Sequence, residues 1–110
     1  MTVDGDFDAN EVSLGSGDDS ISIADFSGRL TNSFYAYGND GDDTYIGRDV
    51  TKTNNTYDYF YGGEGQDTIT GGDASEYFEG GNDEDTIIGG DGNDVLLGGS
   101  ESDVITGGDG

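Results

Sequence analysis

Acidic residues recur at a fixed position of a short glycine-rich unit. The stretch GGDGNDVLL (residues 89–97) combines three glycines, three side chains that can act as oxygen ligands, and three apolar residues. Calcium takes about six to eight oxygen ligands in proteins and mixes carboxylates with backbone carbonyls. Glycine-rich turns can bring successive backbone groups to one ion. The unit therefore predicts a calcium-binding turn. The stretches beside it are of the same kind: GGEGQDTIT (62–70), GGDASEYFE (71–79), GGNDEDTII (80–88) and GGSESDVIT (98–106).

The unit extends through the rest of the chain once two inserts are allowed. With the first glycine as position 1, Gly stands at positions 1, 2 and 4, Asp at position 6 and an apolar residue at position 8. Inserts GRDVTK (47–52) and IADFSG (23–28) keep all upstream units in this frame. GGDG (107–110) is then a truncated repeat. The chain is predicted to be one domain, 1–110, whose two-unit coils are 5–22, 29–46, 53–70, 71–88 and 89–106.

Positions 7–9 of each unit predict a three-residue strand. Alternation places the side chain at position 8 on one face of the strand and those at positions 7 and 9 on the other. Stacked coils would bury the residues at position 8. The fold prediction is all-β: a right-handed parallel β-roll, a β-helix or solenoid of about five coils. The predicted core residues are Val12, Ile21, Ala36, Tyr45, Phe60, Ile69, Phe78, Ile87, Leu96 and Ile105.

Two units complete one coil, so the turns alternate between two edges of the roll. The turns of the first edge end, at position 6, in Asp19, Asp43, Asp67, Asp85 and Asp103. The turns of the second edge end in Asn10, Phe34, Asp58, Glu76 and Asp94. Both inserts precede turns of the second edge. The first edge is therefore predicted to be the regular one, and the second to be degenerate with longer loops.

One turn offers about half of a calcium site, and a second turn stacked roughly 4.8 Å away offers the other half. Ions are thus expected between neighbouring turns, at about four strong sites on the first edge. Weaker sites are expected at Glu76 with Asp94, and at Asp94 with residues 107–110. Asp83 and Glu101 replace Gly at position 4, which would distort these turns or add a ligand, and Ala74 replaces it on the second edge. Further candidate ligands at positions 3 and 4 are Ser16, Gly17, Asp40, Gly41, Glu64, Gly65, Asn82 and Ser100, with Gly92 on the second edge.

Composition limits the partners of the chain. Three basic residues oppose 25 acidic ones, for a formal charge of −22 at pH 7. Such a charge excludes nucleic acid, whose binding needs Lys and Arg, and disfavours anionic membrane surfaces. No apolar run is long enough to insert into a membrane. The absence of Cys and His excludes disulfides, thiolate sites and, in practice, zinc or haem. A chain this acidic and this poor in apolar residues is expected to stay unfolded until cations neutralise it.

The tandem units resemble the RTX (repeats-in-toxin, hemolysin-type calcium-binding) nonapeptide family. Gly89, Gly90, Gly92, Asp94 and Leu96 fit its pattern fully. The resemblance implies a calcium-binding module of a secreted or surface protein, which folds on calcium outside the cell after type I secretion. It also implies a longer polypeptide carrying, for example, an enzyme, toxin or adhesin domain. Neither a signal peptide nor a C-terminal export signal is visible, and the chain ends inside a repeat, so we expect a fragment.

Other functions are weighed on the outward-facing residues. Tyr35, Tyr59 and Tyr77 at position 7, with Tyr37 and Tyr61 at position 9, predict tyrosine rows on one face. Such rows would suit an adhesin or polysaccharide-binding module, or self-association, with calcium only structural. They would equally serve to shield the backbone between glycines. The opposite face carries a Thr array that suggests ice binding, but Ile46, Ile88 and Val104 interrupt it.

Enzyme activity and an EF-hand calcium loop both find little support in the sequence. No His or obvious Lys base accompanies the Ser and Thr residues, so we expect no enzyme activity in this chain. DGDFD (4–8) imitates the start of an EF-hand loop. Ala9 and Gly15 stand where that loop requires Gly and Glu.

Overall fold

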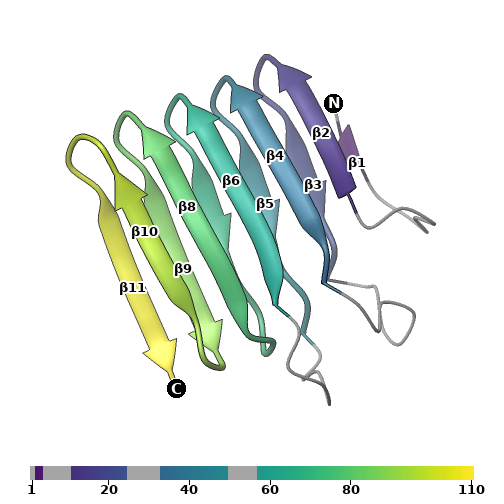
Figure 1. Cartoon of the computed structure of the whole chain (residues 1–110), viewed down its shortest axis with the longest axis vertical. Helices are drawn as coiled ribbons and strands as arrows, with labels where there is room; N and C mark the ends of the chain where they lie inside the picture. Colours follow the sequence, from purple (N-terminus) through teal and green to yellow (C-terminus); the bar gives the residue numbers. More distant parts are fainter. Residues whose placement is uncertain (1, 4–10, 25–32, 50–56) are drawn as a thin grey trace.

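The chain forms two parallel β-sheets that face each other. The computed structural model describes residues 2–3, 11–24, 33–49 and 57–110. Sheet A has the order β1-β3-β5-β7-β9-β11 and sheet B the order β10-β8-β6-β4-β2. Successive strands alternate between the two sheets, so the chain winds as a flattened roll (Figure 1). This confirms the predicted all-β parallel roll. Across the described ranges, no helix that could cross a membrane is found.

The strands follow the repeat. Sheet A contains β1 (Thr2–Val3), β3 (Ser20–Ser22), β5 (Thr44–Ile46), β7 (Thr68–Thr70), β9 (Thr86–Asp91) and β11 (Val104–Asp109). Sheet B contains β2 (Glu11–Ser16), β4 (Tyr35–Asp40), β6 (Asp58–Glu64), β8 (Glu76–Asn82) and β10 (Val95–Gly99). The three-residue prediction holds for β3, β5 and β7 but is wrong for β9, β11 and the strands of sheet B. In these longer strands, pairing continues to positions 2 and 3 of the next unit, through a position-2 residue at positive φ.

Most of the core consists of position-8 side chains, stacked from coil to coil in both sheets. Ile21 pairs with Tyr45, Tyr45 with Ile69 and Ile69 with Ile87 in sheet A, and all four are fully buried. In sheet B, Ala36, Phe60 and Phe78 are likewise fully buried, and the Phe60 ring stacks on Tyr45 with ring centres 4.8 Å apart. Val12 and Leu96 pack partly against this core.

The core prediction is wrong for Ile105, which is 46% exposed. Ile105 belongs to β11, the last strand of sheet A, which has β9 on one side only. A position-8 side chain is fully buried only when strands lie on both sides of its own strand. The position-8 side chain of an outer strand therefore stays at least partly exposed. Conversely, the core includes Leu14, Ile23 and Phe34, which position 8 did not predict. The strand β1 was not predicted, although Thr2 and Val3 fall at positions 7 and 8 of the frame and pair with β3.

Two first-edge turns carry side chains where the unit has glycine. Asp83 and Glu101, at position 4, adopt positive φ angles of 74° and 78°, and the equivalent Gly41 and Gly65 are also at positive φ. The Asp85 N–H still donates to the Asp103 carboxylate at 3.0 Å, so the turns keep their register. The left-handed conformation costs roughly 1–2 kcal/mol for a residue other than glycine. These turns are thus regular but strained.

We expect Glu101→Gly to stabilise the roll by a few tenths to about 1 kcal/mol. Relief of the left-handed strain exceeds the roughly 0.5–1 kcal/mol that glycine costs in lost chain entropy. The measurement is the urea midpoint at saturating calcium. Glu101→Ala is the matched control, because it removes the same carboxylate but keeps the strained φ. Equal midpoints for the two variants would contradict this account.

Candidate metal centre at the first edge

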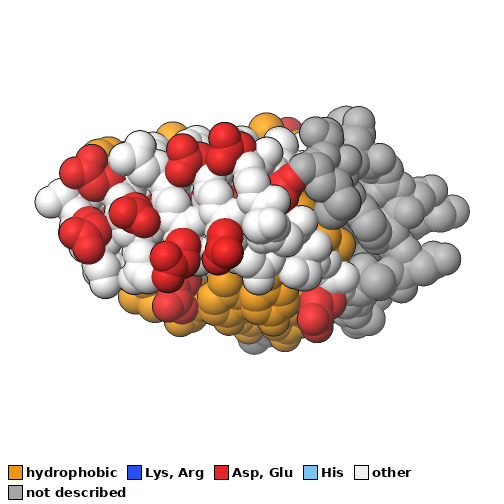
Figure 2. Space-filling view, turned by 90° about the horizontal axis from the view of Figure 1, so that it is seen from above, with side chains coloured by type: hydrophobic (Ala, Val, Ile, Leu, Met, Phe, Trp, Pro, Cys, Tyr) orange, Lys and Arg blue, Asp and Glu red, His pale blue; other side chains and the backbone are white. Residues whose placement is uncertain are grey.

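The turns of the first edge bring the predicted aspartates into one row. Each turn passes from a strand of sheet B to the next strand of sheet A, and Figure 2 looks down on this edge. Asp19 N–H donates to Asp43 Oδ1 and Asp43 N–H to Asp67 Oδ1, both at 2.8 Å. Asp67 N–H donates to Asp85 Oδ1 at 2.8 Å, and Asp85 N–H to Asp103 Oδ1 at 3.0 Å. One carboxylate oxygen of Asp43, Asp67, Asp85 and Asp103 therefore fastens each of their turns to the preceding one.

In the three central aspartates of the row, the second carboxylate oxygen has no hydrogen-bond partner. Asp43, Asp67 and Asp85 are each only 1% exposed, so their Oδ2 atoms are shielded from water. These buried Oδ2 atoms nevertheless accept no hydrogen bond. A buried carboxylate oxygen without a partner carries a large desolvation cost. These atoms lie where a cation between the turns would compensate them.

The glycine at position 1 leaves room for these oxygens. A Cβ on Gly62 would collide with Asp67 Oδ2 and with the carbonyl oxygen of Gly80 in the next turn. A Cβ on Gly38 would collide with Asp43 Oδ2 and the Gly62 carbonyl in the same way. A carboxylate oxygen and a carbonyl oxygen therefore converge beside each of these glycines, which is the mixture of donors that calcium takes.

Burial and crowding raise the pKa values of the row. Desolvation by burial, reinforced by the charges of Asp18 and Asp42, raises the pKa of Asp43 to about 6. Burial, with the neighbouring Asp85 and Asp43, raises the pKa of Asp67 to about 7. Burial also raises the pKa of Asp85. The surroundings of the edge therefore disfavour the ionised form of these carboxyl groups. A bound cation would favour the ionised form again.

Backbone oxygens must complete any ion site here. Among the described residues, no three acidic side chains gather around one point. The carbonyls of Asp40 and Glu64, at position 3, accept hydrogen bonds from the N–H groups of Gly17 and Gly41 at 2.7 and 2.8 Å. The position-4 carbonyl of Gly17 faces Gly41 so closely that a Cβ there would collide with it. Side chains at position 3 are exposed, as for Ser16 and Ser100, and Glu64 accepts a hydrogen bond from Asn82 at 3.1 Å.

The second edge is mixed in character, as predicted. Phe34 occupies position 6 and is fully buried, while Asn10 lies outside the described residues. Asp58 forms a buried ion pair with Arg48 of the insert, which the sequence analysis did not foresee. Glu76 is fully buried, and neither of its carboxylate oxygens has a hydrogen-bond partner. Burial, together with the charge of Asp94, raises the pKa of Glu76 to about 9.

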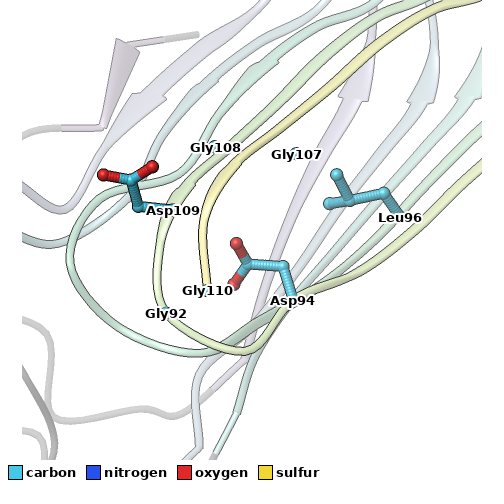
Figure 3. A pocket seen from close by; sticks show the side chains of 7 residues that line it. All are labelled: Gly92, Asp94, Leu96, Gly107, Gly108, Asp109 and Gly110. Atoms are coloured by element: carbon cyan, nitrogen blue, oxygen red, sulfur yellow. The ribbon is translucent and has the colours of Figure 1, made fainter.

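Asp94 repeats the first-edge arrangement at the last turns. Its Oδ1 accepts a hydrogen bond from the Glu76 N–H at 3.0 Å. A pocket beside it is lined by Gly92, Asp94, Leu96 and residues 107–110, and the Asp94 carboxylate lies close to Gly110 while Asp109 points away (Figure 3). The surroundings of Glu76 and Asp94 thus fit a cation better than those of Asp58.

Gly62→Ala should weaken the first edge strongly. Gly62 has no positive φ, so alanine adds no backbone strain there, but its methyl group would displace Asp67 Oδ2. We expect the calcium midpoint of folding to rise about tenfold and stability to fall by about 1–3 kcal/mol. The measurement is a calcium titration followed by far-UV circular dichroism. Gly107→Ala is the matched control, because Gly107 also occupies position 1 and its Cβ would meet nothing within 4 Å. Equal effects in the two variants would reject the role of the glycine.

The predicted tyrosine rows lie on the outer face of sheet B. Tyr35 and Tyr59 stack with ring centres 4.6 Å apart and planes 2° apart, and Tyr37 and Tyr61 stack at 5.3 Å and 9°. Tyr77 continues both rows at a tilt. An apolar surface is seen beside the acidic edge in Figure 2. Because the stacked rings cover one another's faces, a sugar ring cannot lie on them between neighbours. Polysaccharide binding and ice binding stay untested predictions.

The repeated coils and this acidic edge define a repeat module with a candidate metal-binding edge. The chain matches the family model of the RTX calcium-binding nonapeptide repeat in 4 copies, over residues 35–49, 54–87 and 79–110. The matched segments cover more than half of the chain, and the chain therefore belongs to this family. No curated protein and no solved structure gave a match to the chain.

Proposed function

We propose that this chain folds on calcium, which binds between successive turns of the first edge. The observation that carries the proposal is the row of buried, partnerless Oδ2 atoms on Asp43, Asp67 and Asp85. About four ions would occupy the gaps between five turns, each held by carboxylate oxygens of neighbouring aspartates and by backbone carbonyls. The candidate carbonyl donors are those at position 1 that lie beside Oδ2, such as Gly62 and Gly80, and those at positions 3 and 4 of the same turns.

Folding would need calcium because the hydrophobic core is small while the negative charge of the chain is large. Among the described residues the core cluster contains ten buried hydrophobic side chains, whereas in the whole chain 25 acidic residues oppose three basic ones. Without cations, the buried carboxylates lose hydration and repel one another, which opposes folding. With calcium, the free energy of binding becomes free energy of folding. Glu76 and Asp94 offer weaker sites on the second edge.

A calcium titration tests this proposal. We expect far-UV circular dichroism to show a cooperative coil-to-β transition with calcium and none with magnesium at the same concentration. Magnesium demands near-octahedral geometry and loses its water reluctantly, so a carbonyl-rich gap between turns suits it poorly. A β-sheet spectrum already present in chelator at alkaline pH, where the buried carboxyl groups are ionised, would contradict the proposal, because the core alone would then carry the fold.

The setting that follows from calcium-dependent folding is extracellular. A chain that is unfolded at low calcium and folded at high calcium suits a secreted or surface protein. Family membership supports this setting, and it also supports export by type I secretion. Its test is the fate of a secreted fusion: the chain should resist protease in calcium-containing medium and be degraded when a chelator is added.

A further inference from the structure

A buried ion pair takes the place of an open carboxylate at one turn of the second edge. Arg48 is 1% exposed and Asp58 is fully buried. Arg48 Nε donates to Asp58 Oδ2 at 2.8 Å, and Nη2 donates to Oδ1. A guanidinium that engages both carboxylate oxygens is the strongest and most directional form of such a pair. The pair therefore fixes the position of the Asp58 turn.

Asp58 stands in the same pose as the first-edge aspartates. Its Oδ1 accepts a hydrogen bond from the Phe34 N–H at 3.1 Å, just as Asp67 Oδ1 accepts one from the Asp43 N–H at 2.8 Å. The two residues differ at the second oxygen. Oδ2 of Asp67 has no hydrogen-bond partner, whereas Oδ2 of Asp58 is held by Arg48. The guanidinium thus binds the oxygen that the first edge leaves open.

The backbone of the insert holds Arg48 in place. Gly47 N–H donates to the Thr70 carbonyl at 2.7 Å, and Asp73 N–H donates to the Arg48 carbonyl at 2.9 Å. The start of the insert is therefore stacked on the turn that begins at Gly71. From this position, the side chain of Arg48 joins its own coil to the turn at Asp58. Across the strand register, Asp58 is paired with Glu76, the next acidic residue of this edge.

We propose that Arg48 is a built-in cation, which holds the second edge at Asp58 in place of calcium. The comparison with calcium rests on the proposed ion binding at the first edge. The clamp, by which we mean the ion pair between Arg48 and Asp58, does not depend on that proposal. Asp58 is then a latent cation site: without the guanidinium, Asp58 and Glu76 present two buried carboxylates to one gap. The insert that interrupts the repeat therefore replaces a metal site with one that needs no metal.

The test is Arg48→Gln, with bound calcium counted by equilibrium dialysis and stability followed by urea unfolding at saturating calcium. We expect about one more bound ion per chain than in the unmodified protein. The calcium midpoint of folding should rise about threefold or more, because a buried charge has lost its partner. Lys52→Gln is the control, because it removes the same charge four residues further along the chain. It should change neither the ion count nor the midpoint.

A double variant covers the case in which Arg48→Gln does not fold. Arg48→Gln with Asp58→Asn removes both charges, so the proposal expects it to recover most of the lost stability. Failure of that recovery, or equal behaviour of Arg48→Gln and Lys52→Gln, would overturn the clamp. If the unmodified protein binds no calcium, the proposed function fails instead, and the urea midpoints alone still decide whether the clamp exists.

Discussion

Asp67→Asn should raise the calcium concentration needed for folding about tenfold or more. The amide keeps the Oδ1 acceptor that holds the Asp43 N–H, but it places an N–H₂ group where Oδ2 would bind the ion. Asp67 lies in the middle of the row and touches the gaps on both sides, so two ion sites lose a charged ligand. Ligand charge is a main determinant of calcium affinity. The measurement is the midpoint of a circular dichroism titration.

Two further variants make this prediction specific. Glu84→Gln removes one negative charge from an exposed position of a first-edge turn and should leave the midpoint nearly unchanged. Asp19→Asn alters the first aspartate of the row, which adjoins one described gap only, and should have a smaller effect than Asp67→Asn. If all three variants shift the midpoint equally, net charge and not ligation governs calcium binding, and the aspartate row has no special role.

Without calcium, acid should promote folding. The carboxyl pKa values of an unfolded chain lie near 4, whereas burial raises those of Asp43, Asp67 and Glu76 to about 6, 7 and 9 in the folded chain. Between about pH 4 and its own raised pKa, each of these carboxyl groups keeps a proton in the folded state that it has lost in the unfolded state. Stability in chelator therefore falls as the pH rises from about 4 to 9. Circular dichroism in chelator should show β-structure increasing as the pH is lowered from 9 to 5.

Calcium and one neutral variant separate the sources of this pH dependence. Saturating calcium should flatten the profile, because the ion compensates the carboxylates that protons otherwise neutralise. Calcium binding near pH 6.5 should also release protons, which calorimetry in buffers of different ionisation enthalpy measures. Glu76→Gln should remove the part of the profile between about pH 8 and 9, above the range in which Asp43 and Asp67 titrate. Gain of structure with rising pH in chelator would contradict the prediction.

The sequence alone was enough to predict the architecture. A repeat of constant length places equal positions above one another once coils stack, so the period specifies pairing, core and edges together. Ile21, Tyr45, Ile69 and Ile87 could be assigned to one buried stack for this reason. The aspartate row follows from the same arithmetic, because residues 18 or 24 apart in sequence meet on adjacent turns.

Tertiary structure decided what each repeated residue experiences. Asp58 and Asp67 hold the same position of the unit, yet one is neutralised by Arg48 and the other has an oxygen without a partner. Their sequences do not distinguish them, because the path of the insert determines which side chain reaches which turn. Burial is likewise collective: Ile105 fits the pattern as well as Ile87, but it lacks a strand on its outer side and is exposed. Periodicity specifies which residues align, whereas burial and charge compensation depend on the neighbours that the folded chain provides.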